Sequence, residues 1–333
     1  MEPRLTNKSL RTFLLIGLFS FAMVVSQILT APAASAGSRR IYVTCKDSGE
    51  LAVIDVAKRK VIKRISTGRS PGYVALTHQK RHAAVVASKS EKLFIIDTKT
   101  LKVIKKLPLG DNPKGIAISP DDKQAYIVNS GAASNNIYIF GTDLWERLGV
   151  VKTGKEPHNV SFTPDSKTAY VTNASSSDLT SINIKKGVIA GTIKLEKRAR
   201  PHDIAITPDG NYAIITDAIA DSIWVLLLPE EKLIKRIPLN HSHNEVDISP
   251  DGKYAYISGL GSNKVTVLDI MLWAQIKRIT VGDGPHGVVF SPDGTEAYVA
   301  VSREDKVVII DTATKKIKAE IKVEGTPHWI AAE

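Results

Sequence analysis

Cysteine is almost absent from this 333-residue chain, in which Cys45 is the single example. One cysteine cannot form an internal disulfide bond, and it excludes the CxxC motifs of metal sites and haem attachment. Aromatic residues make up only 6% of the chain, and none is interleaved with the clustered lysines as a platform for stacking bases. We therefore expect neither a disulfide framework nor a nucleic-acid partner.

Motifs of several enzyme classes are also missing. The chain has no P-loop and no dinucleotide-binding fingerprint. No G-x-S-x-G elbow places a serine as a nucleophile, and no acid–base pair stands out. These absences favour a binding or scaffold module without catalytic activity of its own.

The one long apolar run lies at the N-terminus. A basic start precedes the apolar stretch Phe13–Leu29, and an A-x-A pattern ends at Ala36. This order is typical of a secretory signal peptide, so we expect cleavage after residues 1–36 and a mature domain of residues 37–333. An uncleaved anchor is the alternative, because the run approaches the length that crosses a bilayer. We predict export to the periplasm or cell surface, with membrane contact only if this segment is retained.

What the chain contains instead is a repeat. Its cleanest copy, residues 281–322, has a G-x-x-P turn, an apolar run, an S-P-D-G turn, a Tyr-Val strand, an Asp-ended strand and a Lys-rich strand. Four short strands in a unit of this length are typical of a β-propeller blade. The residue after the proline, which we call the slot residue, recurs at Gly72, Lys114, His158, His202, Asn244, His286 and His328.

The two ends of the repeat array complement each other. Residues 41–65 contain the second, third and fourth strands of a unit, and residues 326–333 contain only a first strand. Together they make one blade, which predicts an all-β, seven-bladed propeller of four-stranded antiparallel blades. The ring would be closed by pairing of the N-terminal strands with the C-terminal inner strand. An open solenoid is less consistent with these ends, because solenoids need capping repeats.

The strand sequence Tyr170–Asn173, the Ser/Thr-Pro-Asp turns and the Asp-ended strands resemble the YVTN-type β-propeller repeat family. The resemblance covers essentially all of residues 40–333. It implies relatives among surface-layer-type proteins, the haem-binding propeller of periplasmic nitrite reductases, and propeller subunits of quinoprotein amine dehydrogenases. Some seven-bladed relatives are lactonases. The resemblance is specific for the fold and says little about function.

The slot residues are the best candidates for a site. Each opens an innermost strand, so we expect all of them around one mouth of the central channel. Either the histidines bond a neighbouring blade's backbone and are structural, or they bind a haem, a divalent metal, a small anion or a partner's loop. The candidate cofactor-binding residues are His158, His202, His286, His328, Asn244 and Asp203, with His202 and His286 as candidate metal ligands.

Surface charge and apolar turns suggest partners. The net charge is +11, and many of the lysines fall in the last strand of each unit. They either block edge-to-edge sheet pairing or attract an acidic or redox protein subunit. Apolar residues replace the usual polar turn at Leu226–Leu228 and Met271–Trp273, which predicts a subunit-contact surface containing Leu227 and Trp273.

Three functions follow as hypotheses. The first is an exported, non-catalytic scaffold subunit of a periplasmic redox or cell-surface assembly. The second is a cofactor-bearing redox protein or its assembly factor, and the third is a lactonase-like hydrolase. Three tryptophans add a further question, because Trp145, Trp224 and Trp273 precede outer strands. They either pack between blades or form an exposed patch.

Overall fold

The computed structural model describes residues 39–239 and 245–333. The predicted signal peptide and the slot residue Asn244 lie outside these ranges. The part of the chain from Ser38 to Glu333 forms one compact unit. A search of the described residues for a helix long and apolar enough to cross a membrane finds none.

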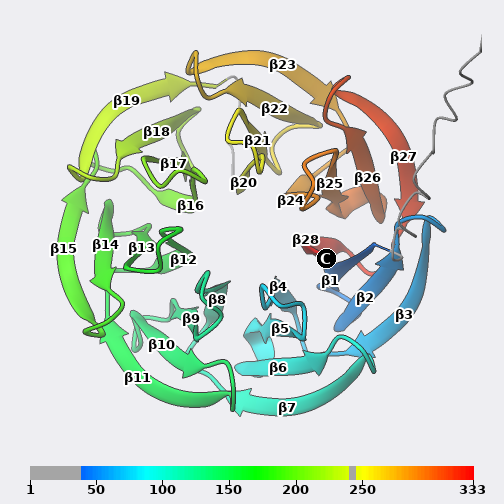
Figure 1. Ribbon diagram of the computed structural model, residues 1–333, viewed down its shortest axis with the longest axis horizontal. Coiled ribbons are helices and arrows are strands. Elements are labelled where there is room, and N and C mark those ends of the chain that lie inside the picture. The colour runs from blue at the N-terminus through cyan, green and yellow to red at the C-terminus, as the bar shows by residue number, and fades with distance from the viewer. Residues whose placement is uncertain (1–38, 240–244) are drawn as a thin grey trace, which may run out of the picture. The chain divides into compact units, whose positions relative to one another are not determined.

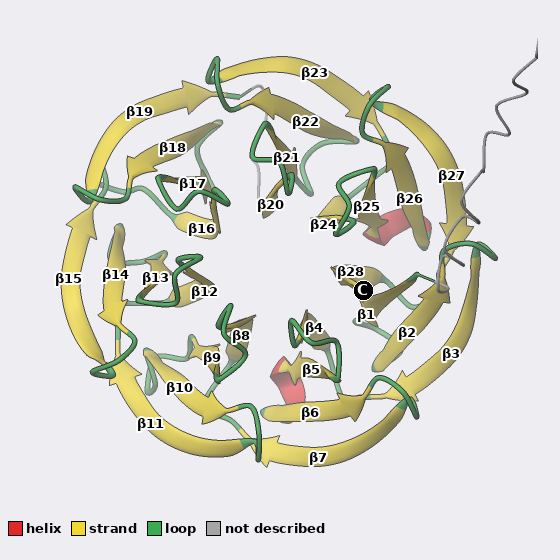
Figure 2. Ribbon diagram, in the orientation of Figure 1, coloured by secondary structure: helices red, strands yellow, loops and turns green. Residues whose placement is uncertain are grey.

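Strands in the described residues form seven four-stranded antiparallel sheets arranged as a ring, which confirms the predicted fold (Figures 1 and 2). The inner strands are β4 (Pro71–Leu76), β8 (Pro113–Ile118), β12 (Pro157–Phe162), β16 (Pro201–Ile206), β20 (Glu245–Ile248), β24 (Pro285–Phe290) and β28 (Pro327–Ala332). The second strands are β1 (Arg40–Cys45), β5 (His82–Ala87), β9 (Gln124–Asn129), β13 (Thr168–Asn173), β17 (Tyr212–Asp217), β21 (Tyr254–Ser258) and β25 (Glu296–Val301).

The third and fourth strands complete each sheet towards the outside of the ring. The third strands are β2 (Glu50–Asp55), β6 (Lys92–Asp97), β10 (Asn136–Gly141), β14 (Asp178–Asn183), β18 (Ser222–Leu227), β22 (Lys264–Asp269) and β26 (Lys306–Asp311). The outer strands are β3 (Lys60–Ser66), β7 (Lys102–Pro108), β11 (Glu146–Lys152), β15 (Val188–Lys194), β19 (Lys232–Pro238), β23 (Ala274–Thr280) and β27 (Lys316–Lys322). Two short 3₁₀ turns, η1 (Ser88–Ser90) and η2 (Ser302–Glu304), follow β5 and β25.

The ring closes where the two ends of the propeller share a sheet, as the repeat count predicts. The sheet order is β28-β1-β2-β3, and Ile41 pairs with Ala332. Arg40 donates through Nε and Nη2 to the two oxygens of Glu333, at 2.6 and 2.7 Å. A two-pronged guanidinium–carboxylate contact holds both distance and orientation, so this pair fixes the end of the closing strand.

Large apolar side chains fill the gaps between neighbouring blades. Phe162 on β12 packs edge-on against Tyr126 of the preceding blade, with ring centroids 4.8 Å apart. Tyr256 and Phe290 repeat the arrangement three blades further on, at 4.7 Å. Face-to-face packing of blades therefore buries the alternating large residues of the inner strands, as their spacing predicts.

The prediction for the first apolar turn is wrong at two of its three leucines. Leu226 and Leu228 are buried in the core cluster between the β12–β15 and β16–β19 sheets. Their spacing of two sends both side chains to the same face of β18, which packs on the preceding blade. Leu226 is fully buried, Leu228 exposes only 5% of its surface, and Leu227 is half-buried, so this turn is not the exposed apolar patch that the sequence predicts.

Of the three tryptophans near the outer strands, two are buried and one is partly exposed. Trp145 and Trp224 are buried between blades, and Trp145 Nε1 donates to His82 Nδ1 at 3.2 Å. Trp273 is half-buried, and Met271 beside it is 87% exposed. The second apolar turn therefore does present an apolar surface, and the partner role of Leu227 and Trp273 stays a prediction.

Candidate functional site

The slot histidines meet at one cavity on the axis of the ring. His158, His202, His286 and His328 line a cavity of about 300 Å³ together with Lys46, Ser70, Gly72, Tyr73, Ser88, Lys89, Asn112 and Lys114. Every inner strand except β20 contributes to this lining. The prediction that the histidines share one mouth of the channel is confirmed, while their role in binding a cofactor stays a prediction.

The imidazoles are stacked in two pairs. The rings of His158 and His202 have centroids 3.6 Å apart at an interplanar angle of 33°. The rings of His286 and His328 repeat this contact at 3.7 Å and 34°. Each pair joins adjacent inner strands, so the close approach of neighbouring blades at the axis produces the stacking.

One imidazole is clearly anchored to a neighbouring blade. His328 Nδ1 lies 3.0 Å from the carbonyl oxygen of Gly72 on β4. Only a protonated nitrogen can donate to a carbonyl, so this contact assigns the proton of the neutral ring to Nδ1 and leaves Nε2 as an acceptor. His328 therefore has the structural role that the sequence left open, and its second nitrogen remains able to accept a hydrogen bond.

Glu245 lies between the two stacked pairs. Its Oε1 is 3.7 Å from His202 Nδ1 and 3.6 Å from His286 Nδ1, and the residue is 1% exposed. Burial, followed by the nearby Asp203 carboxylate, raises the pKa of Glu245 well above its usual value. Its neutral, protonated form is therefore favoured compared with that of an exposed glutamate. The sequence offered a weak signal for it, because it directly follows the slot residue of its blade.

Asp203 occupies a structural position beneath the histidines. Its carboxylate accepts hydrogen bonds from the Asn159 side chain and from the backbone N–H groups of Ile204 and Val246, the latter two at 2.8 and 2.9 Å. These contacts tie β12, β16 and β20 together. Asp203 is not among the residues that line the cavity, and cofactor binding by it stays a prediction.

Tyr73 lines the cavity beside the histidines, and the sequence analysis does not include it among the candidate site residues. Its ring lies edge-on to His158 and His328, with centroid distances of 6.1 and 6.2 Å, and its hydroxyl oxygen is 3.4 Å from His158 Nε2. The slot residue of this blade, Gly72, has no side chain, which leaves room for the following ring to reach the axis. The sequence contains one signal for this role, because an aromatic residue directly follows the only slot residue that is a glycine.

The cavity is electropositive. Burial is the main effect that lowers the pKa of His158 and His286 well below the usual value, and that of His328 to about 3. These three rings are neutral at pH 7. The nearby Lys114 charge adds to the effect on His158, and Lys46 acts on His286 and His328. No carboxylate stands among the described lining residues, so the lysines set the sign of the local potential.

The lining does not fit a haem. A haem needs apolar walls against its two faces and an imidazole free for the iron. The described lining consists of lysine, serine, asparagine, glycine and histidine side chains with Tyr73, and contains no aliphatic side chain. The stacked imidazoles leave no flat apolar slot between them.

A divalent metal has no complete ligand set here either. Across residues 39–239 and 245–333, no three His, Cys, Asp or Glu side chains are grouped to hold a metal ion. His202 and His286 approach the same Glu245 oxygen, and their predicted role as metal ligands stays a prediction.

A family model provides one comparison with known proteins. The model described as "Lactonase, 7-bladed beta-propeller" matches residues 92–238, the stretch from β6 to β19. That stretch contains His158 and His202 but neither Glu245 nor the other stacked pair. A search of curated proteins finds no match.

Solved structures share the whole fold. Hydrazine synthase from Kuenenia stuttgartiensis has a TM-score of 0.77 at 24% identity, over 83% of this chain and 93% of that chain. A functionally unknown protein from Desulfotomaculum acetoxidans has a TM-score of 0.77 at 17% identity, over 89% and 99%. Dihydro-heme d1 dehydrogenase NirN in complex with DHE has a TM-score of 0.68 at 15% identity, over 88% and 75%. These likenesses support the seven-bladed propeller, and membership of the YVTN repeat family stays a prediction.

Proposed function

We propose that this protein is an exported, non-catalytic binding propeller whose axial cavity holds a small anion. One observation carries the proposal: imidazoles from four inner strands and lysines from β8, η1 and the residue after β1 converge on one cavity of about 300 Å³ that has no carboxylate in its described lining. A small charged ligand is typically held in a concave site by a few charged groups that point towards the same place. The size is at the lower end of the range for ligand pockets, about 300–1,000 Å³.

The lysines define where the negative charge would sit. Burial lowers the pKa of Lys114; the nearby Glu156 carboxylate opposes this effect, and the Arg200 and Lys46 charges add to it. An anion placed between Lys46 and Lys114 relieves this repulsion, and that relief supplies part of the binding free energy. His328 Nε2 and the neutral rings around it offer hydrogen-bonding positions to the uncharged part of the ligand.

We further infer that the protein works beside a protein partner in a periplasmic redox or cell-surface assembly. The names of two structural neighbours, hydrazine synthase and dihydro-heme d1 dehydrogenase, support this only as fold-level analogy. The exposed lysines of the outer strands are compatible with an acidic partner subunit, although they also protect the sheet edges.

Thermal unfolding tests the anion site. Phosphate or succinate, titrated at constant ionic strength and pH 7, is expected to raise the melting temperature of the wild-type protein. Lys114→Met should remove most of that increase. The matched control Lys102→Met, on the exposed start of β7, should keep it. Equal increases in both variants would show that the anions act elsewhere, and no increase in the wild type would reject the proposal for these anions.

A lactone-hydrolysing activity is the second candidate, because the family-model match names a lactonase. The test is hydrolysis of a six-membered-ring lactone by the wild-type protein and by His158→Gln. Activity that the variant loses, with folding intact, would replace the non-catalytic proposal. Equal background rates would leave the binding function in place.

A further inference from the structure

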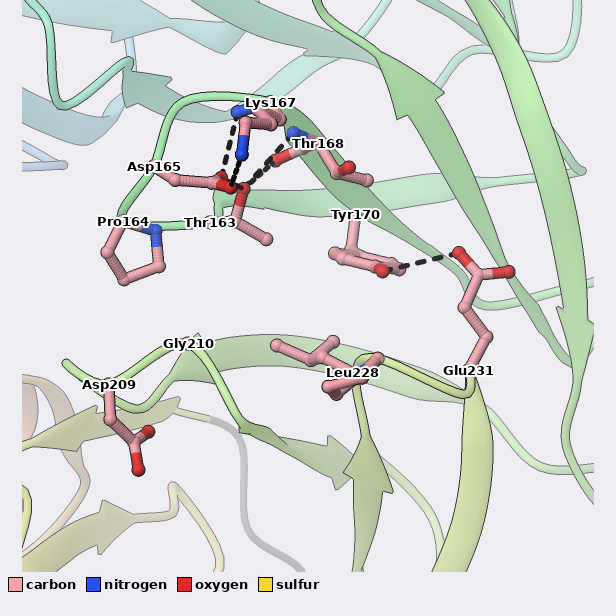
Figure 3. A pocket seen from close by; sticks show the side chains of 11 residues that line it. Thr163, Pro164, Asp165, Lys167, Thr168, Tyr170, Asp209, Gly210, Leu228 and Glu231 are labelled. Carbon is pink, nitrogen blue, oxygen red and sulfur yellow. Dashed lines mark hydrogen bonds and ion pairs between the residues drawn. The ribbon is translucent and has the colours of Figure 1, made fainter.

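Two grooves with both apolar and charged lining residues lie at the other end of the inner strands. The slot residues open these strands and the Ser/Thr-Pro-Asp turns end them, so the turns are on the rim opposite the histidine cavity. The first groove, about 480 Å³, lies between the β12–β15 and β16–β19 sheets and is lined by Pro164, Tyr170, Leu228 and Pro229 among others. Figure 3 shows its two walls, with the turn of Thr163–Thr168 facing Gly210 and Leu228.

The second groove lies one blade further on. It has a volume of about 730 Å³ and is lined by Pro208, Tyr212, Pro250, Ile270, Met271 and Trp273, with polar residues at its rim. Trp273 packs edge-on against Tyr212 across the blade boundary, with ring centroids 5.3 Å apart. Asp209 lines both grooves, so the wall between them carries this carboxylate.

Asp209 breaks the charge pattern of the repeated turns. Each equivalent aspartate in the described turns has a cation: Asp121 pairs with Lys123 at 3.3 Å, Asp165 with Lys167 at 3.0 Å, Asp251 with Lys253 at 3.1 Å, and Asp293 with Arg39. The blade of Asp209 has Asn211 in place of the lysine. Asn211 Nδ2 donates to Asp209 at 2.8 Å, which satisfies an oxygen but leaves the charge uncompensated by any described residue.

Asp209 is ionised at neutral pH. Partial burial opposes ionisation, but hydrogen bonds from Thr207 and Asn211 outweigh it and lower the pKa of this exposed carboxyl. Of the other acids at the groove walls, Asp165 and Asp251 are each paired with a lysine, and Glu231 accepts a hydrogen bond from the Tyr170 hydroxyl at 3.2 Å. The wall between the grooves is therefore a site of net negative charge with apolar surface on both sides.

The second groove also carries Met271, the most exposed of the large apolar side chains among the described residues. Met271 and Leu272 are 87% and 63% exposed. In the next blade the corresponding positions are Ala313 and Thr314. Exposed methionine and leucine beside a half-buried tryptophan are typical of surfaces that a partner covers.

We propose that the two grooves together dock an extended segment of a protein partner that carries a lysine or arginine between two apolar side chains. The basic residue pairs with Asp209, and the apolar side chains occupy the Tyr170–Leu228 groove and the Tyr212–Trp273 groove. An exposed ion pair alone is weak, so the apolar contacts provide most of the affinity and Asp209 provides the selectivity for a basic residue. The site is independent of the histidine cavity.

A displayed library of random 12-residue peptides, selected on the full-length protein, tests this docking site. We expect selected peptides to share a basic residue flanked by apolar residues. Their affinity, measured by fluorescence anisotropy, should fall about two- to fivefold in Asp209→Asn and more strongly in Met271→Ser, and should decrease with added salt. Asp121→Asn, the same change at an equivalent turn, is the matched control and should leave the affinity unchanged.

Three outcomes would overturn the proposal. Peptides without a basic residue, or affinities indifferent to Asp209→Asn and Met271→Ser, would show that the grooves do not recognise this kind of segment. If free arginine displaced the peptide with a dissociation constant equal to that of the peptide, the site would bind a small-molecule cation instead. Self-association in sedimentation velocity that Met271→Ser abolishes would identify a second copy of this chain as the occupant.

Discussion

Burial of His328 in its neutral form predicts a specific loss of stability in acid. Its pKa is lowered to about 3 in the folded protein, against an ordinary value of about 6.5. At pH values between these two pKa values, the imidazole of residue 328 is therefore protonated in the unfolded chain but not in the folded protein. The free energy of unfolding is therefore highest above about pH 7. It decreases towards pH 3, by up to about 1.4 kcal/mol per pH unit.

The magnitude can be worked out for two pH values. Between pH 7.5 and pH 5, this one imidazole accounts for a loss of about 2 kcal/mol in the free energy of unfolding. His328→Asn removes the titration while its amide can still donate to the Gly72 carbonyl, and the chain itself has asparagine at the slot of residue 244. The wild-type protein should therefore lose about 2 kcal/mol more than His328→Asn over this interval.

Urea unfolding followed by tryptophan fluorescence at both pH values measures the difference. His78→Asn, at an exposed position on the first unit's turn, is the matched histidine control and should follow the wild type. If His328→Asn shows the same pH dependence as the wild-type protein, the imidazole is not held neutral by burial. The electrostatic description of the cavity would then be refuted.

Two further predictions concern the geometry of the ring. In Gly287→Ala the new Cβ would lie 2.8 Å from the backbone oxygen of His328, forcing β24 and β28 apart; we expect lower stability and loss of anion binding. Gly149→Ala, where a Cβ would meet nothing within 4 Å, should leave both unchanged, and equal effects in the two variants would contradict the close approach. Arg40→Leu should cost about 1–3 kcal/mol by removing the cation that pairs with Glu333, which keeps only the hydrogen bond from the Tyr42 hydroxyl, and hydrogen exchange should accelerate first in β1 and β28. Uniform acceleration across all blades would argue against a local closure at the chain ends.

The architecture could be predicted from the sequence because the same pattern of turns and strands recurs several times. Each unit repeats the same turns and strand alternation, and the partial units at the ends leave one way to close the ring. The slot histidines could be placed for the same reason, since equivalent positions in a closed ring share one rim. Their detailed pairing into stacked rings could not, because it depends on how closely adjacent inner strands approach.

The missed residues are those that depart from the repeat. Tyr73 reaches the axis only because its own slot is glycine, and Glu245 matters because two other blades bring His202 and His286 to it. The sequence predicts an exposed apolar turn at Leu226 and Leu228, but their two-residue spacing and the packing of β18 bury them. Local sequence does not contain these contacts, because each depends on side chains from a neighbouring or opposite blade.

The most direct test of the axial anion site is NMR of the protein with ¹⁵N-labelled histidine during titration with phosphate or succinate. The sequence has eight histidines, and four of them line the cavity. We predict chemical-shift changes for His158, His202, His286 and His328, with His78 and His82 unaffected. Saturable changes at His78 or His82 alone, or none at the four lining histidines, would contradict an anion site on the propeller axis.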